Sequence, residues 1–221
     1  MNYLLIDTSN QPLSVALMQD DEVLAEVNND KKVNHSVQLM PAVQKVIERS
    51  HVEKRAIDRI VVAEGPGSYT GLRIGVTVAK TLAYSVNAEL YGVSSLKALA
   101  ATVKNIDKQL LVPIFDARRE AVYAGVFKKQ GDTLEVVFEE QYITINDLNR
   151  YLNNLDEEFL FVGIDAVKLK DFLNGEVLEM LPKASSMRTL IAESADIKTF
   201  TPNYLKLSEA ERNWNNQHSK R

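Results

Sequence analysis

The sequence contains no cysteine. This absence excludes disulfide bonds, thiolate nucleophiles and cysteine-ligated zinc, so a metal ion would need histidine or carboxylate ligands. Histidine is also scarce: His35, His51 and His218 lie far apart and lack the helical spacing that places two imidazoles on one metal. We therefore expect no metal site and no cofactor.

Long apolar runs are missing as well. No stretch approaches the roughly 18 apolar residues of a membrane span, and the N-terminus lacks the features of a signal peptide, so we expect a cytoplasmic protein without membrane contact. The net charge of −4 argues against a chain that binds a phosphate backbone alone, and any tRNA contact is expected to be indirect or shared. The basic segment 212–221 is interpreted as a solvated terminus, with contact to RNA as the alternative.

A repeated strand pattern predicts two lobes. An apolar run at 4–6 ends at Asp7 and leads into alternating segments at 13–17 and 22–27, which predicts an antiparallel meander. The pattern recurs where the run 110–116 ends at Asp116 and alternating strands follow. The polar stretch 104–108 is the best boundary, which gives lobes of 1–107 and 108–221. A return of the chain's end to the first lobe is left open.

Two helices of the first half have broad apolar faces. One begins at Asn34 or Ser36 and reaches about residue 49, and its apolar positions cover more than the stripe that one sheet requires. The strand 59–63, a glycine loop at 65–71 and a helix at 72–86 follow.

Two segments could carry chemistry. Residues 7–9, Asp-Thr-Ser, end a strand, where amides and hydroxyls can hold a phosphate; the alternative is an Asx turn. The glycine loop could direct free amides at an anion, although it lacks a P-loop ending and dinucleotide spacing; the alternative is a packing turn in which Gly67 and Gly71 adopt positive φ. The candidate phosphate or nucleotide contacts are Asp7, Thr8, Ser9, Gly65, Gly67, Ser68 and Gly71.

Together these motifs resemble a known family. The sequence reads IDTS at 6–9, HS at 35–36, LMP at 39–41, GPGSYTGLRIG at 65–75 and DAR at 116–118. It is similar in these segments to the TsaB (YeaZ) family of tRNA threonylcarbamoyladenosine biosynthesis proteins, and the resemblance spans nearly the whole chain. The resemblance implies an α/β fold with two lobes of the actin, Hsp70 and sugar-kinase type, each a mixed sheet with flanking helices.

The resemblance also implies an accessory role. Members of this family support a catalytic sister subunit, TsaD, in forming threonylcarbamoyladenosine next to the anticodon of tRNAs that read codons starting with A. An ATPase subunit, TsaE, joins the complex, and the family forms homodimers when alone. Pairing with TsaD is expected through the two helices of the first lobe, at Ser36, Leu39, Met40, Val43, Val46, Ile47, Leu72, Val76 and Ala79.

The same resemblance implies that the catalytic centre is lost. The sister's metal-binding His-x-x-x-His corresponds to Ser95 and Leu99 here, and an acidic residue of the sister corresponds to Gln11. The competing hypotheses are an ATP-dependent small-molecule kinase of the same superfold and, with less support, a metalloprotease.

Overall fold

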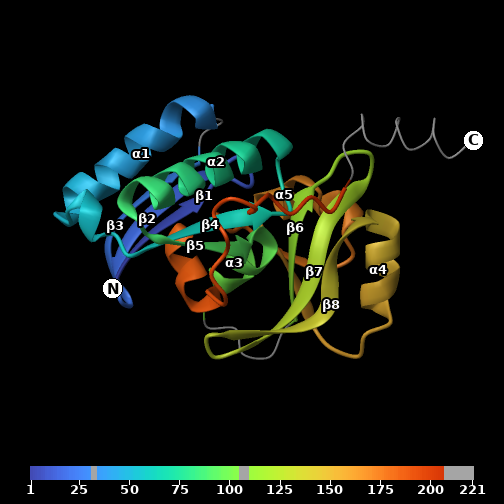
Figure 1. The fold of residues 1–221 in the computed structure, drawn as a ribbon. Helices are drawn as coiled ribbons and strands as arrows, with labels where there is room; N and C mark the ends of the chain where they lie inside the picture. Colours follow the sequence, from blue (N-terminus) through green and yellow to red (C-terminus); the bar gives the residue numbers. More distant parts are fainter. Residues whose placement is uncertain (31–33, 105–109, 207–221) are drawn as a thin grey trace, which may run out of the picture.

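The computed structural model describes residues 1–30, 34–104 and 110–206 and contains two mixed five-stranded sheets (Figure 1). The first sheet has the order β3-β2-β1-β4-β5, in which β1, β2 and β3 are antiparallel and β4 and β5 run parallel to β1. Its strands are β1 (Asn2–Asp7), β2 (Leu13–Gln19), β3 (Glu22–Asn29), β4 (Arg59–Gly65) and β5 (Glu89–Ser94). The predicted meander is confirmed.

The second sheet repeats this topology. Its order is β10-β9-β6-β7-β8, again with an antiparallel meander followed by two parallel strands. The strands are β6 (Leu110–Asp116), β7 (Ala121–Gln130), β8 (Thr133–Thr144), β9 (Phe159–Val162) and β10 (Glu176–Leu178). The duplicated α/β architecture confirms the predicted fold class.

Helices connect the strands, and polar residues cap the longest ones. The α-helices are α1 (His35–Ser50), α2 (Tyr69–Val86), α3 (Ser95–Ala101), α4 (Ile145–Asn153) and α5 (Ile164–Lys168), and the 3-10 helices are η1 (Lys54–Ala56), η2 (Lys170–Phe172) and η3 (Ala184–Leu190). Asn34, Ser68, Ser94 and Thr144 each accept a hydrogen bond from a backbone amide of the first turn. These caps fix where α1, α2, α3 and α4 begin.

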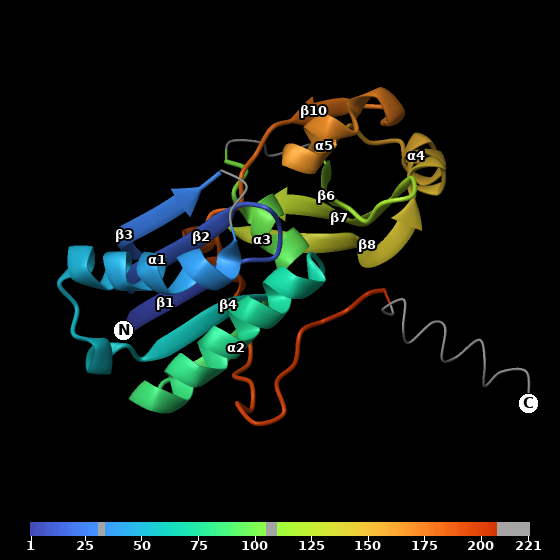
Figure 2. The same ribbon diagram turned by 90° about the horizontal axis from the view of Figure 1, so that it is seen from above.

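The first sheet is covered on both faces. Helices α1 and α2 lie side by side on one face (Figure 2), and their apolar residues share a core with Leu4, Ile6 and Ile60. On the other face α3 and η3 pack through Ala98 and Met187. Strands β1, β2 and β4 are therefore buried almost throughout, as expected for the centre of a sheet between two helical layers, whereas the edge strand β3 is mostly half-buried or exposed.

The end of the described chain returns to the first lobe. The Ala195 amide donates to Leu90 O at 2.7 Å, the Asn203 amide donates to Glu64 O at 2.8 Å, and Lys80 Nζ donates to Phe200 O at 2.7 Å. The proposed boundary near residue 107 and the basic segment 212–221 both lie outside the described residues. None of the described helices is both long and apolar enough to span a membrane.

Candidate functional site

The segment after β1 is locked against the start of α2. Asp7 Oδ1 accepts hydrogen bonds from the Ser9 amide at 2.8 Å and from Ser9 Oγ at 2.7 Å. Thr8 Oγ1 donates to Gly71 O at 2.8 Å, and the Ser68 amide donates to Ser9 O at 2.7 Å. The hydroxyl groups of Thr8 and Ser9 are thus fully buried and already engaged within the chain.

The glycines of the loop allow this close approach. A Cβ atom on Gly67 would collide with Ser9 O, and one on Gly71 would collide with Thr8 O. Gly67 has the expected positive φ, +157°, but the expectation for Gly71 is wrong, because α2 begins at Tyr69 rather than Leu72 and includes Gly71. Glycine is needed at position 71 because the backbone of α2 contacts the backbone of Thr8 there.

The carboxyl group of Asp7 is buried. Burial raises the pKa of its carboxyl, and the hydrogen bonds from Ser9 oppose that rise. Among the described residues, the buried side-chain atoms without a hydrogen-bond partner are Asp7 Oδ2 and His35 Nδ1. His35 is anchored by its other nitrogen, since Nε2 lies 2.9 Å from Asn10 O. A buried polar atom without a hydrogen-bond partner, such as Asp7 Oδ2, is a position where a ligand could bind.

A cleft of 420 Å³ separates the two lobes next to this segment. Residues from the first lobe line one wall, and residues of β6, of β7 and of the turn between them line the other. The lining consists of Ser9, Asn10, Gly67, Ser68, Tyr69, Thr70, Phe115, Asp116, Ala117, Arg118 and Tyr123. Of the seven predicted phosphate contacts, Ser9, Gly67 and Ser68 line this cleft. Asp7, Thr8, Gly65 and Gly71 are buried beside it.

Asp165 joins the two walls beneath the cleft. Its Oδ2 accepts from Asn10 Nδ2 at 2.9 Å and from the Asp116 amide at 3.1 Å, and Lys168 Nζ pairs with Oδ1 at 2.7 Å. Asp165 is only 4% exposed. Sequence reasoning missed this residue; an aspartate shortly after the apolar strand β9, comparable to Asp7 at the end of β1, is the signal that could have identified it.

The C-terminal segment places an aromatic pair at the rim of the cleft. The rings of Tyr69 and Tyr204 are 4.9 Å apart, and the Arg73 guanidinium lies 4.2 Å from the centre of the Tyr69 ring. Arg73 Nε also donates to the Tyr204 hydroxyl at 3.1 Å. The Pro-x-Tyr-Leu segment at 202–205 is therefore held against α2.

A second candidate site lies between α1 and α2. This 520 Å³ groove is lined mostly by apolar side chains: Leu4, Met40, Pro41, Val43, Gln44, Ile47, Lys54, Ile57, Ile60, Leu82, Ser85 and Val86. Of the nine predicted interface residues, six are buried in the chain's own core: Leu39, Val43, Val46, Leu72, Val76 and Ala79.

The exposed residues of these helices leave an apolar surface. Ser36 and Met40 are exposed and Ile47 is half-buried, so these three predicted interface residues remain accessible. Val37, 66% exposed on α1, and Tyr84, 81% exposed on α2, were not predicted. Large apolar side chains exposed beside an apolar groove are typical of a protein interface.

Ser95 and Leu99, which the resemblance places at the positions of the sister subunit's histidines, have structural roles in this chain. Ser95 Oγ accepts from the Gly65 amide at 3.1 Å, and Leu99 is buried in the core around α3. Gln11, the third substituted position, is exposed. Within the described residues, no group of three or more His, Cys, Asp or Glu side chains could hold a metal ion.

Comparison with known proteins identifies the family. The family model described as "TsaD: tRNA N6-adenosine threonylcarbamoyltransferase" matches residues 22–214. The chain is 40% identical over 225 residues to the tRNA threonylcarbamoyladenosine biosynthesis protein TsaB of Bacillus subtilis (strain 168), covering 97% of this chain and 98% of the relative. It is 29% identical over 221 residues to the TsaB protein of Escherichia coli (strain K12), covering 89% and 93%.

A solved structure supports the fold. The structure "YeaZ from Pseudomonas aeruginosa" superposes with a TM-score of 0.78 at 22% identity, and covers 92% of this chain and 99% of that chain. A likeness at this identity establishes the shared architecture, whereas the sequence identity to the Bacillus subtilis relative establishes descent. The chain belongs to the TsaB (YeaZ) family of tRNA threonylcarbamoyladenosine biosynthesis proteins.

Proposed function

We propose that this chain is a non-catalytic accessory subunit that pairs with TsaD through the exposed face of α1 and α2. The observation that carries this proposal is the apolar groove between these helices, next to Val37 and Met40. The chain's own core already occupies the inner faces of both helices. Among residues 1–30, 34–104 and 110–206, the outer apolar surface therefore has no partner, and a helical partner would bury it.

The groove has the chemistry of a helix-packing site. Met40, Ile47 and Leu82 offer apolar contacts, and Gln44 and Ser85 supply the polar rim that such interfaces carry. By the family resemblance, the partner presents two equivalent helices and completes a four-helix arrangement. In the absence of TsaD, a second copy of this chain occupies the same surface as a homodimer. TsaE joins the TsaD pair, and tRNA is contacted jointly.

The residues at the sister's metal positions support the non-catalytic role. The Ser95 hydroxyl oxygen accepts a hydrogen bond from the Gly65 amide, and the Leu99 side chain lies in the core. Neither residue carries an imidazole that could bind a metal ion. Threonylcarbamoyl transfer is accordingly assigned to TsaD.

A matched pair of variants tests the interface. Met40→Asp places a carboxylate in the groove, where an unpaired charge costs several kcal/mol, and should abolish co-purification with the cognate TsaD. Val23→Asp is the control, because Val23 is 45% exposed against 47% for Met40 and does not line the groove. Equal recovery of TsaD with both variants would show that the interface lies elsewhere.

The cleft between the lobes supports a second candidate, an ATP-dependent kinase. Its basis is the bare Asp7 Oδ2 beside a cleft lined by both lobes. ATP turnover by the isolated chain that Asp7→Asn abolishes would favour the kinase, and its absence together with TsaD binding would favour the accessory subunit.

A further inference from the structure

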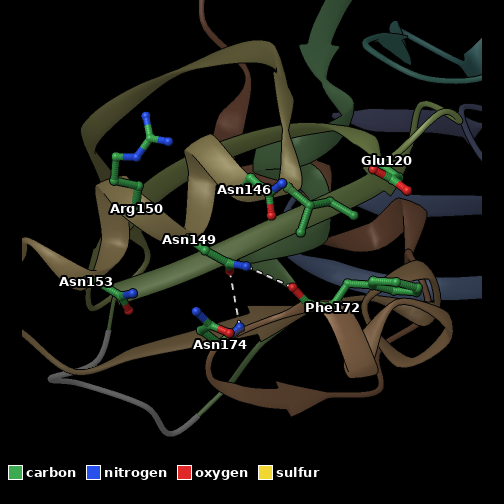
Figure 3. A pocket seen from close by; sticks show the side chains of 8 residues that line it. Glu120, Asn146, Asn149, Arg150, Asn153, Phe172 and Asn174 are labelled. Atoms are coloured by element: carbon green, nitrogen blue, oxygen red, sulfur yellow. Dashed lines mark hydrogen bonds between the residues drawn. The ribbon is translucent and has the colours of Figure 1, made fainter.

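The second lobe contains a cavity rich in asparagine. Figure 3 shows this 510 Å³ cavity between α4 and the segment that follows α5. Four of its eight lining residues are asparagines: the lining consists of Glu120, Ile145, Asn146, Asn149, Arg150, Asn153, Phe172 and Asn174. We call this space the amide cavity. Its volume lies in the range of small-ligand sites.

Asn149 builds the cavity. This side chain is only 7% exposed, and both ends of its amide are used. Its Nδ2 donates to Phe172 O at 2.8 Å, and its Oδ1 accepts from the Asn174 amide at 3.1 Å (Figure 3). The wall that carries Phe172 and Asn174 is thereby held at a fixed distance from α4, so the cavity is preformed.

The remaining asparagines have no structural explanation. Within the described residues, the side-chain amides of Asn146, Asn153 and Asn174 form no hydrogen bond. Asn146 lies in the first turn of α4 and Asn153 is its last residue, and both side chains are exposed. Their spacing of three and four residues from Asn149 places them on the same face of the helix. Three side-chain amides that line one cavity and form no hydrogen bond within the described residues are available to a ligand.

Phe172 adds an aromatic surface. Its side chain is 59% exposed at the edge of the amide cavity, which leaves a large apolar ring in water. Hydrogen bonding of its carbonyl oxygen to Asn149 fixes the backbone that carries the ring. A flat ligand could stack on Phe172 while its edge meets the amides.

The charges exclude an anion as the recognised group. Arg150 Nη1 is paired with Asp147 at 3.1 Å, and the other charged residue of the lining is the acidic Glu120. The lining of the amide cavity therefore has no excess of positive charge with which to bind a phosphate. A neutral planar ligand with hydrogen-bond donors and acceptors along its edge fits this environment.

We propose that the amide cavity binds a nucleobase. Asparagine presents a donor and an acceptor in one plane, which matches the edge of a base, and unpaired bases stack on exposed aromatic rings. The assignment of that base to an RNA strand rests on the proposed role in tRNA modification. Phosphate contacts then belong to other parts of the complex.

Titration of the full-length protein tests this site. Nitrogen-labelled protein is titrated with adenosine, with cytidine, with a single-stranded hexaribonucleotide and with maltose, and the side-chain amide signals are followed by NMR. We expect the signals of Asn146, Asn153 and Asn174 to shift with the nucleosides and the hexamer. Shifts with maltose alone, or with none of the four probes, would overturn the proposal.

Variants locate the binding. Combined Asn146→Ala and Asn153→Ala should weaken nucleoside binding about tenfold or more, because two hydrogen bonds are lost, while the exposed positions leave folding intact. Phe172→Ala should weaken it similarly by loss of stacking. The control is Asn154→Ala, since Asn154 is exposed at the end of the same helix but does not line the cavity. Equal loss in the control would overturn the site.

The titrations and the variants also distinguish the nucleobase site from the proposed accessory role. Tighter binding of the hexamer than of the nucleosides supports an RNA strand as the source of the base, and equal binding overturns that source. Retention of TsaD by Met40→Asp overturns the accessory interface without affecting nucleoside-induced shifts. Absence of those shifts overturns the amide cavity as a nucleobase site even when TsaD binding is intact.

Discussion

Replacing Gly75 with alanine should destabilise the protein, contrary to the usual effect of this change in a helix. Gly75 lies inside α2, where alanine normally stabilises by about 1 kcal/mol. Here a Cβ atom would overlap Thr8 Oγ1, which is buried and donates to Gly71 O at 2.8 Å. The hydroxyl cannot move away without losing that hydrogen bond.

The expected magnitude follows from three contributions. Overpacking of a tight contact costs about 1–3 kcal/mol, and loss of the buried hydrogen bond costs about 1 kcal/mol more. The gain in helix propensity offsets about 1 kcal/mol. The free energy of unfolding should therefore fall by about 2 kcal/mol, which lowers the melting temperature of a chain of this length by roughly 4–8 °C.

A double-mutant cycle measures the contact between Thr8 and Gly75 directly. Urea denaturation is followed for Gly75→Ala, for Thr8→Ala and for the double variant, which should be more stable than the sum of the single effects predicts, by about 1 kcal/mol or more. Thr77→Ala, at an exposed position of α2, is the control and should change stability by less than about 0.5 kcal/mol. Stabilisation by Gly75→Ala, or additivity in the cycle, would refute the reasoning.

Three further substitutions follow from buried carboxylates. Burial raises the pKa of Asp7 above its ordinary 3.8. The stabilisation that protonated Asp7 provides is therefore complete below pH 3.8 and is lost as the pH rises and the buried carboxyl ionises. In urea denaturation, Asp7→Asn should be more stable than wild type at pH 7 and should show no such gain at pH 3. Burial likewise raises the pKa of Glu140, whose carboxylate accepts a hydrogen bond from Ser94 Oγ. Glu140→Gln should therefore have a higher melting temperature than wild type above pH 4.5. Asp165→Ala removes the acceptor of two partly buried donors, Asn10 Nδ2 and the Asp116 amide, and should cost about 1–3 kcal/mol of unfolding free energy in urea. A cost below about 0.5 kcal/mol would contradict the bridging role of Asp165.

The antiparallel meander at the start of the chain and its recurrence in the second half could be predicted, because apolar runs and alternation indicate which strand residues are buried. The start of α2 could not, since the glycines that allow α2 to approach residues 7–9 resemble a loop in sequence. Ser68 begins the helix by accepting from the Gly71 amide at 3.3 Å. Ser68 is therefore the N-cap of α2. Because glycines and a proline surround it in the sequence, the segment has the composition of a loop and the cap is not evident.

The interface residues show a different limit. Periodicity identifies the apolar positions of a helix, but it cannot show which of them meet the helix's own sheet. Val43 is 2% exposed and Met40 47% exposed, three residues apart on α1, and only the packed structure separates them. Val43→Asp is accordingly expected to unfold the lobe, whereas Met40→Asp probes the surface. The interface itself stays a prediction.

Residues joined from distant segments were beyond sequence reasoning. Asp165 meets Asn10 across 155 positions of the chain, and the amide cavity combines α4 with a segment about 20 residues later. Neither forms a motif with fixed spacing. Their signal lies in residue type instead: a buried aspartate after a strand, and asparagines repeated at a spacing of three and four residues on one helical face.

The duplicated topology connects the two proposed sites. In each sheet, one helix follows the meander and a second helical segment follows the next strand: α1 and α2 in the first lobe, α4 and then α5 with η2 in the second. The apolar groove lies between α1 and α2, and the amide cavity lies between α4 and the segment of η2. Since the architecture places a hollow at both positions, the composition of each lining distinguishes their roles. Methionine, isoleucine and leucine suit a packed helix, whereas bare amides beside an exposed phenylalanine suit a planar ring with hydrogen-bonding edges.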